Sequence, residues 1–310
     1  MNGTVIVDKP AGKTSFDVVH EIRKILHIKK IGHTGTLDPL TTGVLPVCIN
    51  EATKLIRFFA HDDKEYRATM LLGVETDTLD MEGTIVARKK PAVTDREIQH
   101  AIKSFTGKIE QRVPRYSAVK IKGKPLHRWT REGIHITPPV KTIEIYRITI
   151  ESIALPYVTF VVACSKGTYI RSLCADIGRR LGCGACLYRL RRIKSGHFGE
   201  ESAIILEGLD KKKKELSIKQ NLISMVDMLP HFCSITIDAD IANKIRNGCH
   251  PGMDVLNGCR TEGLKEGDII KFVSEDRHIV AIARMLLSPE EIGPSYTKDS
   301  MVKILRVFNN

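Results

Sequence analysis

Short runs of apolar residues, alternating with polar ones or clustered together, follow one another along most of the chain and predict β-strands. Two segments instead repeat apolar residues every three or four positions, which predicts helices at 14–28, with Thr14 or Ser15 as the N-cap, and at 170–181. Strands dominate and helices are interspersed irregularly, so we expect an α+β fold with a mixed, mainly antiparallel central sheet. The runs rich in β-branched and aromatic residues are 4–10, 66–74, 142–155 and 157–164.

Three segments between these elements do not read as simple strands or helices. Residues 31–47, IGHTGTLDPLTTGVLPV, predict a loop rich in glycine and threonine. Residues 108–140 are rich in Lys and Arg, are broken by prolines and contain the only tryptophan, which indicates a flexible insertion or a binding arm. Residues 210–221 contain four consecutive lysines and indicate a solvated helix end or a linker.

A change in composition near residue 230 predicts a domain boundary. We expect a catalytic domain over residues 1–230 and a smaller β-rich module over 231–310. The apolar runs that suggest β-structure in the module are 244–255, 264–276 and 278–287.

The net charge is distributed unevenly between these two parts. The chain has 48 Lys and Arg against 36 Asp and Glu. Residues 231–310 contain 10 basic and 11 acidic residues, so residues 1–230, with 38 and 25, carry the whole excess. Such an excess favours a polyanionic partner, although basic charge can also serve solubility alone.

Composition also narrows the location of the protein. At 42% hydrophobic and 27% charged residues the chain is typical of a globular protein. It has no apolar stretch long enough to cross a membrane, and its first residues lack the form of a signal peptide. We therefore expect a soluble, cytoplasmic protein that makes no membrane contact.

Metal and nucleotide motifs are incomplete in this sequence. Cys183 and Cys186 have CxxC spacing, but no second pair follows to complete a zinc site, and the spacing of Cys249, His250 and Cys259 fits no standard knuckle. AGKT resembles the end of a Walker A motif, yet the required first glycine is Val7. We expect neither a metal nor a cofactor.

Asp38 is the first candidate for chemistry. It precedes a proline, which disfavours helical geometry and stiffens the backbone, and Gly35 and Gly43 could let another chain approach closely. Asp-Pro is commonly a turn starter, so a structural role remains open. As a nucleophile or general base, Asp38 needs a nearby cation to stay ionised. Arg171, in the first turn of the 170–181 helix, can supply it, or it can be an ordinary surface arginine.

Several motifs in order resemble those of the TruB family of pseudouridine synthases, which modify the T-loop uridine at position 55 of tRNA. The resemblance covers nearly the whole chain, and its tail resembles a PUA domain, an RNA-binding module. It implies a pseudouridine synthase fold with a PUA-like barrel, tRNA as the partner and a cofactor-free isomerisation of a flipped-out base. The segments that carry it are VDKPAGKTS, GHTGTLDPLTTGVLPVCINEATKL, KEYRATMLLGVETDTLDMEG, QRVPRYSAVKIKGK, GTYIRSLCADIG and LGCGACLYRLRRIKSGHF.

The resemblance also implies roles for five residues. Asp38 is the catalyst, which attacks the sugar or the base or removes a proton from the sugar. Tyr66 stacks on the target base and assists a proton transfer, Arg171 pairs with Asp38, Leu190 closes the other face of the base, and His33 enters the T-loop in place of flipped nucleotides.

The sequence departs from the family pattern within the insertion. After the glycine-lysine pair the family commonly continues with Arg-Leu-Tyr, whereas this chain has Pro125 and His127 instead, and Trp129 could compensate with aromatic surface. One alternative is a guide-RNA-dependent synthase of the dyskerin type, which lacks a long RNA-gripping insertion. Another is a non-catalytic RNA-binding or RNA-folding protein on the same scaffold. The main interpretation is a monomer that needs no protein partner.

Overall fold

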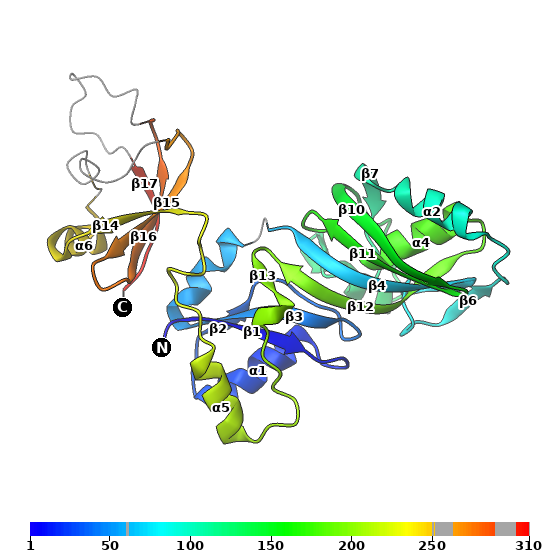
Figure 1. Cartoon of the computed structure of the whole chain (residues 1–310), viewed down its shortest axis with the longest axis horizontal. Helices are drawn as coiled ribbons and strands as arrows, with labels where there is room; N and C mark the ends of the chain where they lie inside the picture. The colour runs from blue at the N-terminus through cyan, green and yellow to red at the C-terminus, as the bar shows by residue number, and fades with distance from the viewer. Residues whose placement is uncertain (60–61, 250, 252–262, 289–301, 310) are drawn as a thin grey trace.

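The computed structural model of the chain describes residues 1–59, 62–249, 251, 263–288 and 302–309. Two separate sheets form the frame of the molecule, a large one in the first part of the chain and a small one near the C-terminus (Figure 1). The helices are α1 (Ser15–Leu26), α2 (Asp95–Lys103), α3 (Leu126–Arg131), α4 (Ile170–Arg180), α5 (Lys211–Gln220) and α6 (Ala239–Arg246), with 3-10 helices η1 (Asn50–Phe58) and η2 (Glu200–Ser202).

The large sheet has nine strands and is mixed. Its main path runs β1-β3-β12-β4-β11-β10-β7, with β2 paired to β3 and β13 paired to β12. Every neighbouring pair is antiparallel except β12 with β3. The strands are β1 (Gly3–Lys9), β2 (Ile31–His33), β3 (Thr42–Ile49), β4 (Lys64–Leu72), β7 (Gly107–Arg112), β10 (Val140–Ala154), β11 (Tyr157–Cys164), β12 (Ala185–Ser195) and β13 (Phe198–Gly199).

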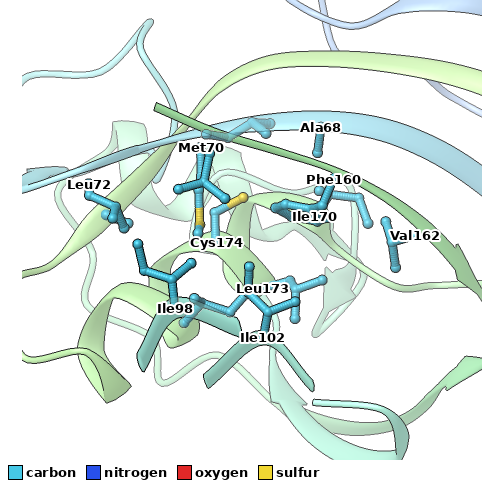
Figure 2. Packing of buried hydrophobic residues seen from close by; sticks show 14 of the residues in the cluster. Ala68, Met70, Leu72, Ile98, Ile102, Phe160, Val162, Ile170, Leu173 and Cys174 are labelled. Atoms are coloured by element: carbon cyan, nitrogen blue, oxygen red, sulfur yellow. The ribbon is translucent and has the colours of Figure 1, made fainter. Parts of the chain in front are cut away.

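Helices cover one face of this sheet in two groups. Helices α2 and α4 pack on the half formed by β4, β10 and β11, and Figure 2 shows side chains of β4 and β11 meeting those of the two helices. Helix α1 packs on the other half, against β1 and β3, because its apolar residues fall on one side. Thr14 caps α1 through a reciprocal capping box with Asp17, which agrees with the predicted helix start.

The predicted loop over residues 31–47 is wrong in its extent. Residues 31–33 form β2 and residues 42–47 belong to β3, so only residues 34–41 remain a loop. The run GVLPVCI is nearly all buried in the middle of the sheet. A strand buried on both faces does not alternate, which is why its turn-like glycines and threonines misled the prediction.

The small sheet has four strands in the order β14-β15-β16-β17, with β14 and β15 parallel and the other pairs antiparallel. The strands are β14 (Cys233–Ile237), β15 (Ile269–Ser274), β16 (Ile279–Met285) and β17 (Val302–Val307). The predicted β-run at 244–255 is not a strand where the structure describes it, because its first residues end α6. Residues 252–262 and 289–301 lie outside the described residues, so the barrel and the boundary near 230 remain predictions.

Two short hairpins complete the described fold. Strands β5 (Val74–Thr76) and β6 (Ile85–Arg88) pair next to β12, and β8 (Lys120–Ile121) and β9 (Lys124–Pro125) pair within the predicted insertion. The start of that insertion, residues 108–112, is part of β7 in the large sheet. In the described part of the chain, no helix has the length and apolar character needed to cross a bilayer.

Candidate active site

A cleft of about 450 Å³ opens on the sheet face that carries the helices, where the 34–41 loop meets the start of α4. Its walls come from segments that are far apart in the sequence, and Tyr66 at its floor packs against both apolar clusters of that face. The lining residues are 34–38, 41, 59, 64, 66, 117–119, 166–171, 190 and 192.

Asp38 begins a tight turn that is anchored on both sides. Before it, Leu37 is buried and its N–H donates to the Ser15 hydroxyl at 2.8 Å, which ties the loop to the start of α1. After it, the Thr41 N–H donates to the Asp38 carbonyl at 3.0 Å and closes the turn. The Asp38 side chain is 46% exposed and lines the cleft, so a fixed backbone presents an accessible carboxylate.

Lys9 supports the same turn from below. Its buried ammonium donates to the carbonyls of Pro10, Lys13 and Pro39, and so joins the end of β1 to the Asp38 loop. Burial lowers the pKa of Lys9 to about 8, and the charge of Asp38 opposes that shift. No pattern in the sequence singled out this lysine.

Arg171 lies in the first turn of α4 and joins two carboxylates. One guanidinium nitrogen, Nη2, is 3.0 Å from Asp38 Oδ2, and the other, Nη1, is 3.4 Å from Asp80 Oδ2. Nη1 and Nη2 also donate to the carbonyls of Thr78 and Tyr116, each at 2.9 Å. Arg171 is 6% exposed, so it is not the surface arginine of the alternative interpretation. Its planar fork is held at four points and fixes the direction of the Asp38 carboxylate.

Strands β4 and β12 bring Tyr66 and Leu190 into the same cleft. Their antiparallel register pairs Leu190 with Ala68 and Arg192 with Tyr66, so all four side chains point to one face. Burial raises the pKa of the Tyr66 phenol, and the neighbouring Arg192 guanidinium offsets part of that rise. An aromatic and an aliphatic side chain are therefore available to hold a planar base beside Asp38.

His33 stands next to the cleft but does not line it. It is half-buried at the end of β2 and pairs with Val47 across the ladder, whereas the next two residues, Thr34 and Gly35, do line the cleft. Burial, with a contribution from the Arg192 charge, lowers the pKa of His33. Asp38, Tyr66, Arg171 and Leu190 thus share one cavity, and His33 flanks it.

The two glycines around Asp38 lie close to Arg192 of strand β12. A Cβ at Gly43, where φ is +98°, would lie 2.2 Å from the Arg192 carbonyl oxygen, and one at Gly35 would lie 3.3 Å from Arg192 Nη1. The expectation that the two glycines admit an external chain stays a prediction. The approach that requires them is that of β12 to β3 and to the Asp38 loop.

The insertion closes one side of the cleft. Ser117, Ala118 and Val119 line it, and the His127 backbone N–H donates to the Ser117 carbonyl at 3.1 Å, with its ring Nδ1 2.9 Å from the same oxygen. His127, a departure from the family pattern, therefore anchors the part of the insertion that meets the cleft. Trp129 is half-buried in α3, and its Nε1 donates to the carbonyl of Ile121 in the β8–β9 hairpin at 3.2 Å.

The cysteines singled out in the sequence are separated from this cleft. Cys183 and Cys186 are buried, and burial raises the pKa of both thiols, that of Cys186 to about 11. Across the residues with a described position, no three His, Cys, Asp or Glu side chains group as metal ligands. Cys249 is exposed, while His250 and Cys259 lie outside the described residues.

Asp80, Lys9, Lys64 and Arg192 are the site residues that sequence reasoning missed. Asp80 is buried and binds Arg171, while Lys64 and Arg192 line the cleft. Asp80 lies in TDTLDMEG and Arg192 in LYRLRRIKS, both within segments that carried the family resemblance. Each of these two residues has other charged residues near it in the sequence, so the sequence alone did not show which of them belongs to the site.

A mixed sheet that presents an aspartate–arginine pair, an aromatic and an aliphatic side chain in one cleft is the arrangement that the resemblance to pseudouridine synthases implies. The sequence models of two domains match this chain: the TruB family pseudouridylate synthase N-terminal domain over residues 23–170, and the tRNA pseudouridylate synthase B C-terminal domain over residues 171–227. The chain belongs to the TruB family of pseudouridylate synthases, and it is an isomerase.

Full-length relatives support this assignment. A tRNA pseudouridine synthase B of Syntrophus aciditrophicus is 49% identical over 310 residues, which cover 100% of this chain and 99% of that protein. A protein of the same name from Geobacter sulfurreducens is 41% identical and is covered completely, as is this chain.

Solved structures confirm the predicted α+β fold with its mixed sheet. A Cbf5-Nop10-Gar1 complex contains a chain that is 29% identical and matches with a TM-score of 0.71, over 98% of this chain and 84% of that one. A chain from an H/ACA RNP bound to a substrate RNA containing 2'-deoxyuridine is 27% identical, with a TM-score of 0.71 over 99% and 85% of the two chains.

Proposed function

We propose that this enzyme converts uridine 55 in the T-loop of tRNA to pseudouridine, with Asp38 as the catalytic residue. The observation that carries the proposal is the Asp38–Arg171–Asp80 arrangement, in which a buried guanidinium orients an accessible carboxylate. Relatives that span the whole chain bear the name tRNA pseudouridine synthase B, which supports tRNA as the substrate.

The chemistry needs one well-placed carboxylate. The bond between N1 of uracil and the ribose breaks, the base turns, and C5 is joined to the same sugar carbon without a change in oxidation state. Asp38 can attack the sugar or the base, or remove a proton from the sugar, and each route requires an ionised carboxylate at a fixed position. Arg171 supports that charge, and the turn that ends at Thr41 fixes the position.

The cleft accommodates a base that has left the RNA helix. Its volume of about 450 Å³ lies in the range of pockets that bury small ligands. Flipping a nucleotide costs a few kcal/mol, and stacking of the base between Tyr66 and Leu190 offsets that cost. We propose that His33, on the rim, occupies the space that the flipped nucleotides leave in the T-loop.

Basic residues at the C-terminal end of α1 offer contacts for the RNA backbone. Where this end of α1 meets the start of α5, Lys24, His27, Lys211 and Lys212 are exposed, with Lys211 Nζ 3.1 Å from His27 Nε2. The other end of α1 is tied to the Asp38 loop through Ser15, so one helix connects the loop and this basic surface. Phosphate contacts of this kind make binding weaken steeply as salt rises.

We propose that the enzyme acts as a monomer on tRNA without a guide RNA or protein partner. The insertion between β7 and β10 supports this, because it supplies its own wall of the cleft through residues 117–119. The module over 231–310 would act as a PUA-like RNA-binding domain. A second role in RNA folding is compatible with the same surfaces.

The test is to incubate the purified protein alone with unmodified tRNA and to map pseudouridine by mass spectrometry. Asp38→Asn keeps the size and polarity of the side chain, so we expect product at position 55 to disappear while tRNA affinity changes little. Asp240→Asn, an exposed carboxylate in α6, is the matched control and should stay fully active. Product with Asp38→Asn, or no product without a guide RNA, would refute the proposal.

A further inference from the structure

Arg192 is a buried arginine in the cleft wall that has no role in the mechanism so far. It is 1% exposed, its Nε donates to the Val44 carbonyl at 2.7 Å, and its Nη2 donates to the Gly35 carbonyl at 3.3 Å. Among the described residues no carboxylate forms an ion pair with it. The titratable group that faces it is the neutral Tyr66 phenol.

A buried cation without a counter-ion is costly and calls for an explanation. Buried charges in proteins are normally paired, because an isolated one loses several kcal/mol of hydration. The field of Arg192 extends through the site, since its charge lowers the pKa of Lys9, His33 and Lys64. Arg192 can therefore stabilise a further negative charge, in addition to that of Asp38, when one forms during the reaction.

Tyr66 is the protein group at which such charge can form. Arg192 and Tyr66 are direct partners in the register of β12 and β4, and both line the cleft. Guanidinium nitrogens only donate hydrogen bonds, so they stabilise the phenolate form of a tyrosine over the phenol. Arg171 cannot serve this purpose, because its fork is already occupied by Asp38 and Asp80.

The isomerisation contains a step that uses a phenolate. Once C5 of uracil is bonded to the sugar, C5 still carries a hydrogen that must leave as a proton, while N1 has lost its bond to the sugar. A phenolate can take the C5 proton, N1 gains one from water, and re-ionisation of the phenol returns one to water. The protons balance, and no oxidant or reductant is needed.

We propose that Arg192 is a positioning residue that holds Tyr66 and stabilises its phenolate, so that Tyr66 removes the proton from C5 of the re-attached uracil. The inference rests on the proposed function, and what it adds is the role of Arg192, which supports the proton transfer that the family resemblance already implies for Tyr66. It also accounts for the buried charge, because the phenolate is the counter-ion of Arg192 during turnover.

The experiment compares kcat at saturating RNA for tRNA carrying hydrogen or deuterium at C5 of the target uridine. In Arg192→Gln we expect kcat to fall about 100-fold, in the range that general base catalysis contributes. The deuterium isotope effect should grow relative to wild type, since C5–H cleavage becomes slower than the other steps. The rise of kcat with pH should shift to higher pH, because the phenolate forms less readily.

Two further variants separate this role from a structural one. In a Tyr66→Phe background, Arg192→Gln should add no further isotope effect and no further pH shift. Arg192→Lys keeps the charge, so it should retain more of the C5 step than Arg192→Gln. Arg189→Gln, an exposed arginine on the same strand, is the control for lost charge.

The outcomes distinguish failure of the inference from failure of the proposed function. A wild-type enzyme without product at position 55 would refute the proposed function. An active wild type whose Arg192 variants slow without a larger isotope effect would refute the inference alone. If Arg192→Gln does not fold, Arg192→Lys with an unchanged isotope effect and pH profile would refute it equally.

Discussion

Arg171→Lys tests whether the geometry of the guanidinium, and not only its charge, controls catalysis. In the structure two different nitrogens serve the two carboxylates, at 3.0 Å from Asp38 and 3.4 Å from Asp80, and both nitrogens also hold backbone carbonyls. A lysine ammonium is a single nitrogen at the end of a flexible chain. It cannot occupy both positions at once, so it must release at least one carboxylate.

The expected loss of activity in Arg171→Lys follows from the number of carboxylate contacts that the lysine cannot keep. A hydrogen bond to a charged group contributes about 1.5–3 kcal/mol, so loss of one such contact to Asp38 lowers the rate roughly 10- to 150-fold. Because Asp80 is buried, the ammonium should remain with it and leave Asp38 less well oriented. We therefore expect the loss to appear in kcat under saturating tRNA and not in tRNA affinity.

Single-turnover measurement of pseudouridine formation checks this prediction. Arg179→Lys is the matched control, since Arg179 lies on the same helix, is exposed, and pairs with Asp176 at 2.7 Å. It should retain wild-type turnover. Near wild-type turnover in Arg171→Lys would show that charge alone suffices, and would remove the Asp38–Arg171–Asp80 arrangement as the basis of catalysis.

Three further predictions concern binding and stability. Burial lowers the pKa of Lys64 to about 8, so the positive charge of Lys64 is lost as pH rises through that value. The affinity for tRNA should therefore weaken between about pH 7 and 9. In binding titrations, Lys64→Gln should make the affinity depend less on pH. Lys211→Glu should reduce the slope of log Kd against log salt by about 1, whereas Lys219→Glu, already paired with Glu215, should change it less. Lys271→Met leaves two buried carbonyls, those of Val226 and Leu229, without their donor, and should lower the free energy of unfolding by about 2 kcal/mol in denaturant titrations.

The sequence was sufficient to predict the elements whose residues follow a regular period. The helix from Ser15 and the long strands β10 and β11 were found because one face of each is apolar and the other polar. Strand β3 was missed because it is buried on both faces, and its first residues, Thr42 and Gly43, resemble a turn. Periodicity carries no information for a strand that has no exposed face.

The site shows the same limit at the level of single residues. Asp38, Tyr66, Arg171 and Leu190 could be named because they lie in motifs that resemble a known family, and the structure brings them into one cleft. Arg192 could not, because its importance depends on being buried opposite Tyr66, and its neighbour in sequence, Arg191, is an equally plausible arginine. The structure separates the two: Arg191 binds the carboxylate of Asp8, at 2.8 Å, while Arg192 has no described carboxylate partner.

The predicted boundary near residue 230 does not imply two independent bodies. One apolar cluster joins Ile6 and Phe59 of the first part to Val273 and Phe308 of the C-terminal module. Each such side chain contributes about 1.5–3 kcal/mol when it is buried, so removal of the module would expose a surface that stabilises the catalytic domain. Loss of activity in a truncated chain would then report unfolding as readily as lost RNA contact. The contribution of the module to tRNA binding must therefore be read from exposed charges on its surface, with the shared cluster intact.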